Sequence, residues 1–313
     1  MRDWRSVPLG VDLGATRVRV ACGEAGRAGA VRLRAVGARD LPEEPALVPA
    51  LLEELLDELG TRERRCVLVL GSPHVSLRCI RFPKMTWAER VRASRYEAAR
   101  IADWATEAEP AVVRTHPCAG AHAVGVARAA ALGERIATVR SAGLRVVGVD
   151  HDAFALRRHL GACDAIADVG AERTSLHCFP ATGPHTFSVA RGGATVTHGI
   201  AEELGIDVAS AERRKRILGC SGAGIPARHA VVAQLASLIE RGRTRGGIER
   251  IAITGNGARL PRFVQEIEDA TGALAEMPIA AILQTSDYPE DVLRAAAPDW
   301  TLAAGLLDWS LAG

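Results

Sequence analysis

The stretch LGVDLGATRVRVAC at residues 9–22 has a similar counterpart 156 positions later, AIADVGAERTSLHC at residues 165–178. Over the eleven positions that begin at Asp12, the two stretches agree five times, and both contain an Asp-x-Gly turn (Asp12-Leu13-Gly14 and Asp168-Val169-Gly170). Residues 17–20 alternate between arginine and valine, which is the periodicity of a β-strand. A self-match at this spacing, in the same strand–turn–strand context, predicts a chain built of two duplicated α/β halves.

Each Asp-x-Gly turn offers what a phosphate site needs. Glycine and small residues let backbone N–H groups approach a phosphate closely. The aspartates, Asp12 and Asp168, can hold Mg²⁺ through water, because this ion keeps most of its hydration shell. One such turn would be explained by turn formation alone, but two equivalent turns after buried strands favour a phosphate site. The candidate phosphate contacts are Gly14, Ala15, Thr16, Gly170 and Thr174.

A third glycine turn and a helical pair complete the candidate site. Gly255, Asn256 and Gly257 follow a predicted buried strand, so their backbone can lie against adenosine or a phosphate, although an ordinary strand–helix turn has the same pattern. Glu212 and Lys215 are three residues apart on a predicted helix and therefore face one side. They either contact a ribose and a base or form a surface ion pair.

Composition and the remaining motifs exclude several classes of protein. The 313 residues suit about two domains, and a net charge of +2 with few aromatic residues argues against a dedicated nucleic-acid binder. The seven cysteines are scattered, which favours a reducing cytoplasm over a disulfide or zinc framework. No apolar run approaches the roughly 20 residues that span a bilayer, so membrane association would require a partner. Neither a P-loop nor a Rossmann fingerprint is present.

The pattern also predicts a domain division. The first half covers residues 1–160 and contains an inserted α/β module at about 73–147, in which Thr86 caps a helix. The second half covers residues 161–298, with a small lid at about 198–247. Residues 299–313 are expected to form a helix that packs back on the first half.

The order of these elements resembles the actin, hexokinase and heat-shock chaperone ATPase superfamily. Within it, the chain is similar to the PilM family of type IV pilus assembly, which is related to FtsA. The segments that carry this similarity, besides the turns, are residues 78–85, 95–98, 141–156, 192–193, 211–215 and 303–306. The resemblance implies an α/β, actin-like ATPase fold.

The resemblance also implies ligands and a partner. The ligands would be ATP and Mg²⁺, with Asp12 and Asp168 flanking the ion. The partner would be a PilN-like bitopic membrane protein, whose short cytoplasmic N-terminal peptide would lie beside the inserted module at the inner membrane, with no nucleic acid involved. Apolar residues at the start of the module would contribute to that groove: Val75, Leu77, Ile80 and Phe82. Two departures weaken the expected nucleotide affinity: Asn256 replaces a glycine, and the segment between Lys215 and Ile248 is short.

Hydrolysis is expected to be weak or absent. Asp152 is the best candidate for orienting a water molecule on the γ-phosphate, and Asp150 is the second. Both residues could instead cap the helix that begins near Ala153. Two alternatives to an ATP-binding scaffold stay open: a sugar or metabolite kinase of the same superfamily, and an actin-like relative that binds no nucleotide.

Overall fold

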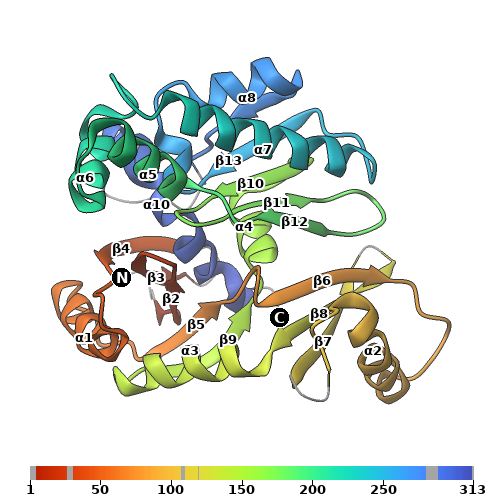
Figure 1. Cartoon of the computed structure of the whole chain (residues 1–313). Coiled ribbons are helices and arrows are strands. Elements are labelled where there is room, and N and C mark those ends of the chain that lie inside the picture. Colours follow the sequence, from red (N-terminus) through yellow and green to blue (C-terminus); the bar gives the residue numbers. More distant parts are fainter. Residues whose placement is uncertain (1–4, 27–30, 107–109, 119, 280–287, 312–313) are drawn as a thin grey trace.

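The computed structural model of the chain contains two mixed sheets, a smaller three-stranded sheet, and helices between and around them (Figure 1). It describes residues 5–26, 31–106, 110–118, 120–279 and 288–311. The two last residues of the predicted C-terminal helix, 312 and 313, lie outside these ranges, as do residues 280–287 of the second half. None of the described helices combines the length and the apolar character that a membrane crossing requires.

The first sheet is built around the Asp12 turn. Its central strands run in the order β4-β3-β2-β5-β9, and a short β1 extends it beside β3. β2 pairs antiparallel with β3 and parallel with β5, and β5 pairs parallel with β9. The strands are β1 (Arg5–Ser6), β2 (Leu9–Leu13), β3 (Arg17–Ala25), β4 (Val31–Asp40), β5 (Arg65–Val69) and β9 (Arg145–Asp150).

The second sheet repeats this arrangement around the Asp168 turn. Its order is β12-β11-β10-β13-β14, with antiparallel pairing at β10–β11 and β11–β12 and parallel pairing at β10–β13 and β13–β14. Each strand therefore has a counterpart in the first sheet, and the predicted duplication is confirmed at the level of topology. The strands are β10 (Ala165–Val169), β11 (Thr174–Cys178), β12 (His185–Val189), β13 (Arg250–Thr254) and β14 (Leu274–Glu276).

Two helices, α4 (Asp152–Leu160) and α10 (Glu290–Gly305), lie between the sheets (Figure 1). α10 packs on β2 and β3, and it approaches so closely that a Cβ built on Gly10 would lie 2.0 Å from the Ala303 carbonyl oxygen. Only glycine fits at this crossing. The short η3 (Leu307–Leu311) follows α10 and packs beside α4.

The outer faces of the sheets are covered by separate helices. On the first sheet, α1 buries leucines at helical spacing, Leu52, Leu55 and Leu56, each contributing about 1.5–3 kcal/mol on full burial. α5, α7 and α8 bury the outer face of the second sheet, and α6 packs on α5. The outer helices are η1 (Pro45–Leu47), α1 (Val48–Glu58), α3 (Ala129–Ser141), α5 (Gly193–Leu204), α6 (Val208–Leu218), α7 (Ile225–Arg243), η2 (Asn256–Arg259) and α8 (Phe263–Thr271).

The inserted module is a three-stranded sheet, β6-β8-β7, covered by α2. Its elements are β6 (Val75–Ile80), α2 (Trp87–Ile101), β7 (Ala111–Cys118) and β8 (Ala121–Arg128). As predicted, Thr86 caps α2, in a reciprocal capping box with Glu89.

The module differs from the prediction at its end. α3 and β9 were assigned to the module, but β9 pairs with β5 in the first sheet and α3 packs against α1. β7 and β12 were not predicted as strands. β7 carries His116 and Pro117, and proline is tolerated there because β7 is an edge strand.

Candidate functional site

The two Asp-x-Gly turns have the same backbone geometry. The Gly14 N–H donates to the Arg17 carbonyl at 2.9 Å, and the Gly170 N–H donates to the Arg173 carbonyl at 2.9 Å. In both turns a Cβ on the glycine would lie 3.0 Å from that carbonyl oxygen. Ala15, at the tip of the first turn, is exposed and therefore accessible to a ligand.

The charge around Asp12 is balanced by arginine. Antiparallel pairing places Asp12 directly opposite Arg19, whose Nη1 donates to the Asp12 carboxylate at 3.0 Å. Burial raises the pKa of Asp12, and Arg19 and Arg135 offset part of that rise. Arg135 also donates to the Leu13 carbonyl beside it. The first turn is thus held in an ion-paired state.

A second carboxylate, Asp299 on α10, joins this arrangement. Its oxygens accept from Arg17 Nη1 at 2.6 Å and from Arg19 Nε at 2.7 Å. The Asn256 amide donates to the same carboxylate at 2.6 Å. Asp299 is buried and connects the first turn, the glycine turn and α10. Since the Asn256 side chain is committed to Asp299, its predicted place beside adenosine is limited to its backbone.

Asp168 has no such balance. Its cross-strand neighbour is Ser175, and within the described ranges no cation or donor pairs with its carboxylate. Burial raises the pKa of Asp168 to about 7, the negative charges of Asp152 and Asp12 add to the rise, and the charge of Arg19 offsets only part of it. The second turn therefore presents a carboxylate in a field of other carboxylates, which a cation would neutralise.

A hydrated Mg²⁺ fits this environment. It would stabilise the ionised Asp168, whose pKa is raised by burial and then by the charges of Asp152 and Asp12. Mg²⁺ at nucleotide sites keeps several waters and needs only one or two carboxylates. Among the described residues, no group of three or more His, Cys, Asp or Glu side chains is arranged to hold a metal. When bound, the ion would neutralise phosphate charge between the two turns.

The predicted threonines differ. Thr16 is exposed at the tip of the first turn. Thr174 is fully buried, and its hydroxyl donates to the Arg191 carbonyl at 2.7 Å. Because that proton is committed to a carbonyl, Thr174 has no donor left for a phosphate oxygen. The phosphate contacts of Thr16 and Thr174 stay predictions, and only Thr16 is exposed.

The glycine turn packs against the second hairpin. Gly255 has φ +85°, and a Cβ there would lie 2.5 Å from Asp168 Oδ1. A Cβ on Gly257 would lie 2.4 Å from Val169 Cγ1. The glycines are therefore needed for close approach to the Asp168 turn, a reason that the sequence did not reveal, and a contact with adenosine stays a prediction.

Glu212 and Lys215 form an ion pair, with Lys215 Nζ 2.6 Å from Glu212 Oε2. The pair is not merely a surface contact, because Lys215 Nζ also donates to the Gly193 carbonyl at 3.0 Å and to Thr197 Oγ1 at 2.7 Å. Burial opposes a charged Glu212, but the bonds from Lys215 and Thr197 outweigh it and lower its pKa. The pair therefore fastens α6 to the start of α5.

An ion pair also joins the two halves at α6. Arg216 Nη1 donates to Asp40 Oδ2 at 3.0 Å, and Arg17 Nε forms an ion pair with Asp40 Oδ1 at 2.9 Å. Asp40 ends β4 in the first sheet, whereas Arg216 lies on α6 in the second half. The contact therefore bridges from α6 to the arginines beside the first turn.

Asp152 and Asp150 lie at the start of α4. The Asp152 Oδ1 atom lies 2.7 Å from His151 Nδ1 and accepts from the Ala153 N–H at 2.7 Å, and the same N–H donates to His151 Nδ1 at 3.1 Å. Burial favours a neutral Asp152, but His151 and His177 outweigh it and hold the pKa well below its usual range. Asp150 pairs with Arg158. The N-cap of α4 is His151, so Asp152 is the first residue of the helix and not its cap, and its role in hydrolysis stays a prediction.

Sequence reasoning missed the charged residues around the first turn. Arg19 could have been found, because a tight hairpin through Gly14 places position 19 opposite position 12. Asp299 could not have been found from the sequence, because it lies 280 residues from Arg19 and only the packing of α10 brings the two residues together. Arg135 could not have been found either, because it lies on α3, 122 residues after the Leu13 carbonyl that it contacts.

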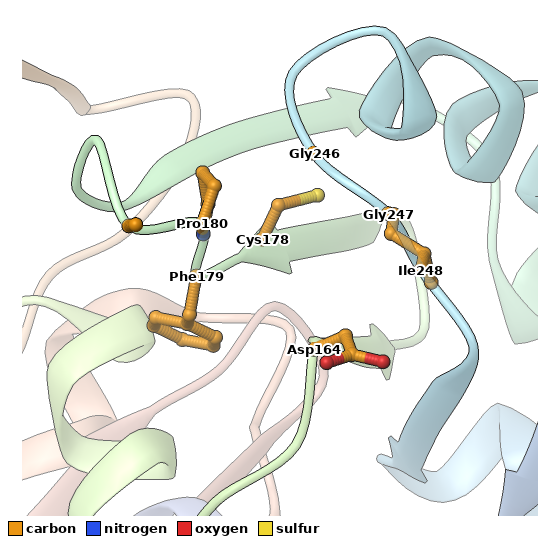
Figure 2. Close-up of a pocket in the computed structure, with 8 residues that line it drawn as sticks. Asp164, Cys178, Phe179, Pro180, Gly246, Gly247 and Ile248 are labelled. Carbon is orange, nitrogen blue, oxygen red and sulfur yellow. The ribbon is translucent and has the colours of Figure 1, made fainter.

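A small pocket of about 290 Å³ lies at the other end of the second sheet (Figure 2). Asp164, just before β10, lines it, whereas Asp168 lies near the end of β10. The Asp164 carboxylate accepts from the backbone N–H groups of Glu249 and Arg250, both at 2.9 Å. This carboxylate is satisfied internally, and the pocket is separate from the candidate nucleotide site.

A larger groove of about 810 Å³ lies between β6 of the module and β12 of the second half. Val75 and Leu77 line it, as the prediction for a partner groove required. Ile80 and Phe82 instead pack into the module's own core against α2 and β8. The facing wall of this groove is formed by residues of β12 in the second half, among them His185 and Phe187.

Comparison with known proteins agrees with this architecture. No family model and no curated protein matches the sequence. A solved PilM–PilN type IV pilus biogenesis complex matches with a TM-score of 0.84 and 25% identity, over 96% of this chain and 97% of that one. The ethanolamine utilization protein EutJ from Carboxydothermus hydrogenoformans matches with a TM-score of 0.61 and 14% identity, over 97% and 89%. An activator of 2-hydroxyisocaproyl-CoA dehydratase from Clostridium difficile, with bound ADPNP, matches with a TM-score of 0.51 and 12% identity, over 98% of this chain and 94% of that one.

Proposed function

With an actin-like ATPase fold and the predicted resemblance to PilM confirmed, we propose that this chain is an ATP-binding scaffold of a type IV pilus or related assembly. It binds the cytoplasmic tail of a PilN-like inner-membrane protein. The observation that carries the proposal is the similarity to the PilM–PilN complex over nearly the full length of both chains.

The nucleotide part of the proposal rests on the two turns. Asp168 supplies an unpaired carboxylate for Mg²⁺, and the exposed tip at Ala15 and Thr16 supplies N–H groups for phosphates. Arg19 lies on β3 beside the first turn. Its guanidinium group can bind a phosphate if it leaves the Asp12 carboxylate. A solved protein of similar fold holds ADPNP, which agrees with a nucleotide-binding role for this fold.

The partner part rests on the groove between β6 and β12. β6 is an edge of the module sheet and β12 is an edge of the second sheet. Edge strands carry backbone groups that an extended peptide can pair with, while side-chain pockets such as those beside Val75 and Leu77 give specificity. A short tail of a membrane protein would therefore recruit the chain.

The groove is tested with Leu77→Glu, which places a charge on its β6 wall. We expect this variant to lose capture of a synthetic PilN-like N-terminal peptide by at least about tenfold, the cost of burying an unpaired charge, while ATP binding is retained. Leu274→Glu, at an exposed position of β14, is the matched control. Unchanged capture by Leu77→Glu would place the partner elsewhere, and joint loss of peptide and ATP binding would indicate misfolding.

Two other functions are separated by nucleotide assays. The ion pair between Asp12 and Arg19 favours an actin-like relative that binds no nucleotide, and a titration in which ATP fails to bind with Mg²⁺ present would support it. A kinase would turn over at about 1–100 per second with its substrate. Because Asp152 Oδ1 accepts from the Ala153 N–H and lies against His151, we expect turnover well below that range.

A further inference from the structure

The positive charge of this chain is concentrated in the inserted module. Residues 73–128 hold nine of the 39 Lys and Arg residues but only five of the 37 Asp and Glu residues. The imbalance is strongest from Arg78 to Arg100, where seven cationic residues accompany two carboxylates. The remainder of the chain is slightly acidic by the same counts. A charge concentration of this kind attracts anionic partners.

Much of this charge lies on the outer side of α2. The helix packs on the module sheet through its inner side, where Ser94 and Ala98 are buried. The opposite side carries four exposed residues, which we call the basic face: Arg92, Arg95, Tyr96 and Arg100. Tyr96 is 86% exposed. α2 lies at the outer edge of the module, away from the second half (Figure 1).

Few carboxylates neutralise the basic face. Glu89 is engaged in the capping box with Thr86, and Glu97 pairs with Arg100 at 3.2 Å. Across the described part of the chain, no carboxylate pairs with Arg92 or Arg95. These guanidinium groups are thus available to an external anion.

The approach to α2 adds further charge and a second aromatic ring. Arg81 and Lys84, in the segment that leads into the helix, are exposed. Trp87, the first residue of α2, is 71% exposed. Exposed arginines accompanied by tryptophan and tyrosine are typical of surfaces that lie at the headgroup level of a bilayer.

We propose that the basic face of α2 contacts a membrane surface that contains anionic phospholipids. Arginine side chains bind phosphate groups of lipids, and their attraction to an anionic bilayer adds up over the cluster. A nucleic acid would also meet the arginines, but Tyr96 stands on a convex helix and offers no groove in which bases could stack.

This contact complements the proposed partner, although its test does not depend on that partner. One weak membrane signal gives reversible binding, and two signals on one protein give stable attachment. A tail bound between β6 and β12 would hold the module near the bilayer, and the basic face would then add its own affinity at a high local concentration.

The experiment is co-sedimentation of the full chain alone with vesicles. One set contains equal parts of phosphatidylglycerol and phosphatidylcholine, and the other contains phosphatidylcholine only. The variant is Arg92→Gln with Arg95→Gln. Its matched control is Arg140→Gln with Arg145→Gln, which removes two exposed arginines from α3 and β9 of the first half. Thermal unfolding of each variant confirms that it is folded.

The parent is expected to bind only the anionic vesicles and to be released between about 0.1 and 1 M salt, as the Debye length falls from ~10 to 3 Å. The Arg92/Arg95 variant should lose at least about fivefold in binding, and the control should not. The fluorescence of Trp87, obtained as the difference from Trp87→Phe, should shift to the blue. Equal binding to both vesicle types, equal loss in the control, or competition by RNA at stoichiometric amounts would overturn the proposal. So would the absence of binding to anionic vesicles.

Discussion

The two Asp-x-Gly hairpins share a backbone but differ in charge. In both, the glycine N–H closes the turn at 2.9 Å, and the aspartate lies opposite the seventh residue after it. In the first hairpin that residue is Arg19, which pairs with Asp12 and Asp299. In the second it is Ser175, and Asp168 stays unpaired among the residues that the structure describes.

This difference suggests a division of labour between two copies of one motif. The first hairpin is tied to α10 through Asp299, so it contributes mainly to the connection between the halves. The second keeps a carboxyl group whose pKa is raised by burial and by the charges of Asp152 and Asp12, and which Arg19 stabilises only in part, so a proton or a bound cation would stabilise it further. The predictions below test whether the two aspartates really differ in this way.

The largest decrease in the free energy of unfolding is expected from Asp299→Ala. The substitution leaves Arg17, Arg19 and Asn256 without their shared acceptor in a buried position. Removing one partner of a buried ion pair costs about 3–5 kcal/mol. Urea unfolding should show this decrease in the free energy of unfolding, with Asp308→Ala, on η3, as a comparison. A loss below about 1 kcal/mol would mean that α10 is not held by this cluster.

Asp12→Asn is expected to lower the free energy of unfolding by less than Asp299→Ala does. Arg19 loses one charged partner but keeps Asp299 at 2.7 Å. A hydrogen bond to a charged group is worth about 1.5–3 kcal/mol, and the asparagine retains part of it. We therefore expect a decrease of about 1–2 kcal/mol in the same unfolding assay. If Asp12→Asn is as stable as the parent, the first hairpin does not depend on its ion pair.

Asp168→Asn is expected to raise the free energy of unfolding, whereas the two substitutions above lower it. The folded pKa is about 7 and the ordinary value is 3.8, so between these pH values the unfolded carboxyl ionises while the folded one stays protonated. Asp168 therefore lowers the stability of the parent as pH rises from about 4 to 7. Asparagine stays neutral, so the variant should gain up to about 4 kcal/mol over the parent above pH 7 without Mg²⁺, since each unit of pKa shift is equivalent to about 1.4 kcal/mol. The gain should disappear at acidic pH.

Unfolding measured across this pH range decides the point. A constant difference between Asp168→Asn and the parent would show that the Asp168 carboxyl has an ordinary pKa. A loss of stability at high pH would show that Asp168 is paired in solution.

The sequence predicted the backbone of the site better than its charges. The turns at Asp12 and Asp168 follow from local glycine chemistry and strand periodicity, and the duplicated topology follows from their repeat. The pairing with Asp299 depends on where a helix some 280 residues away packs, which no local pattern encodes. The end of the module was misplaced because the strand at Arg145 to Asp150 pairs with β5, and strand pairing is not visible in periodicity.

The role of Gly255 shows the same limit. Its place after a buried strand was predictable, but the reason for a glycine is the contact with the Asp168 turn, which arises from the parallel pairing of β10 and β13. The sequence identified the residue but not the neighbour that requires it.

The central claim, that Asp168 provides the cation site of a Mg-nucleotide, is tested most directly by calorimetric titration of ATP with and without Mg²⁺. The parent should bind ATP much more tightly when Mg²⁺ is present. Asp168→Asn should lose at least about tenfold in Mg²⁺-dependent affinity, equivalent to 1.4 kcal/mol, and more than Asp12→Asn loses. If Asp168→Asn binds Mg-ATP as tightly as the parent, the assignment of the second hairpin is contradicted.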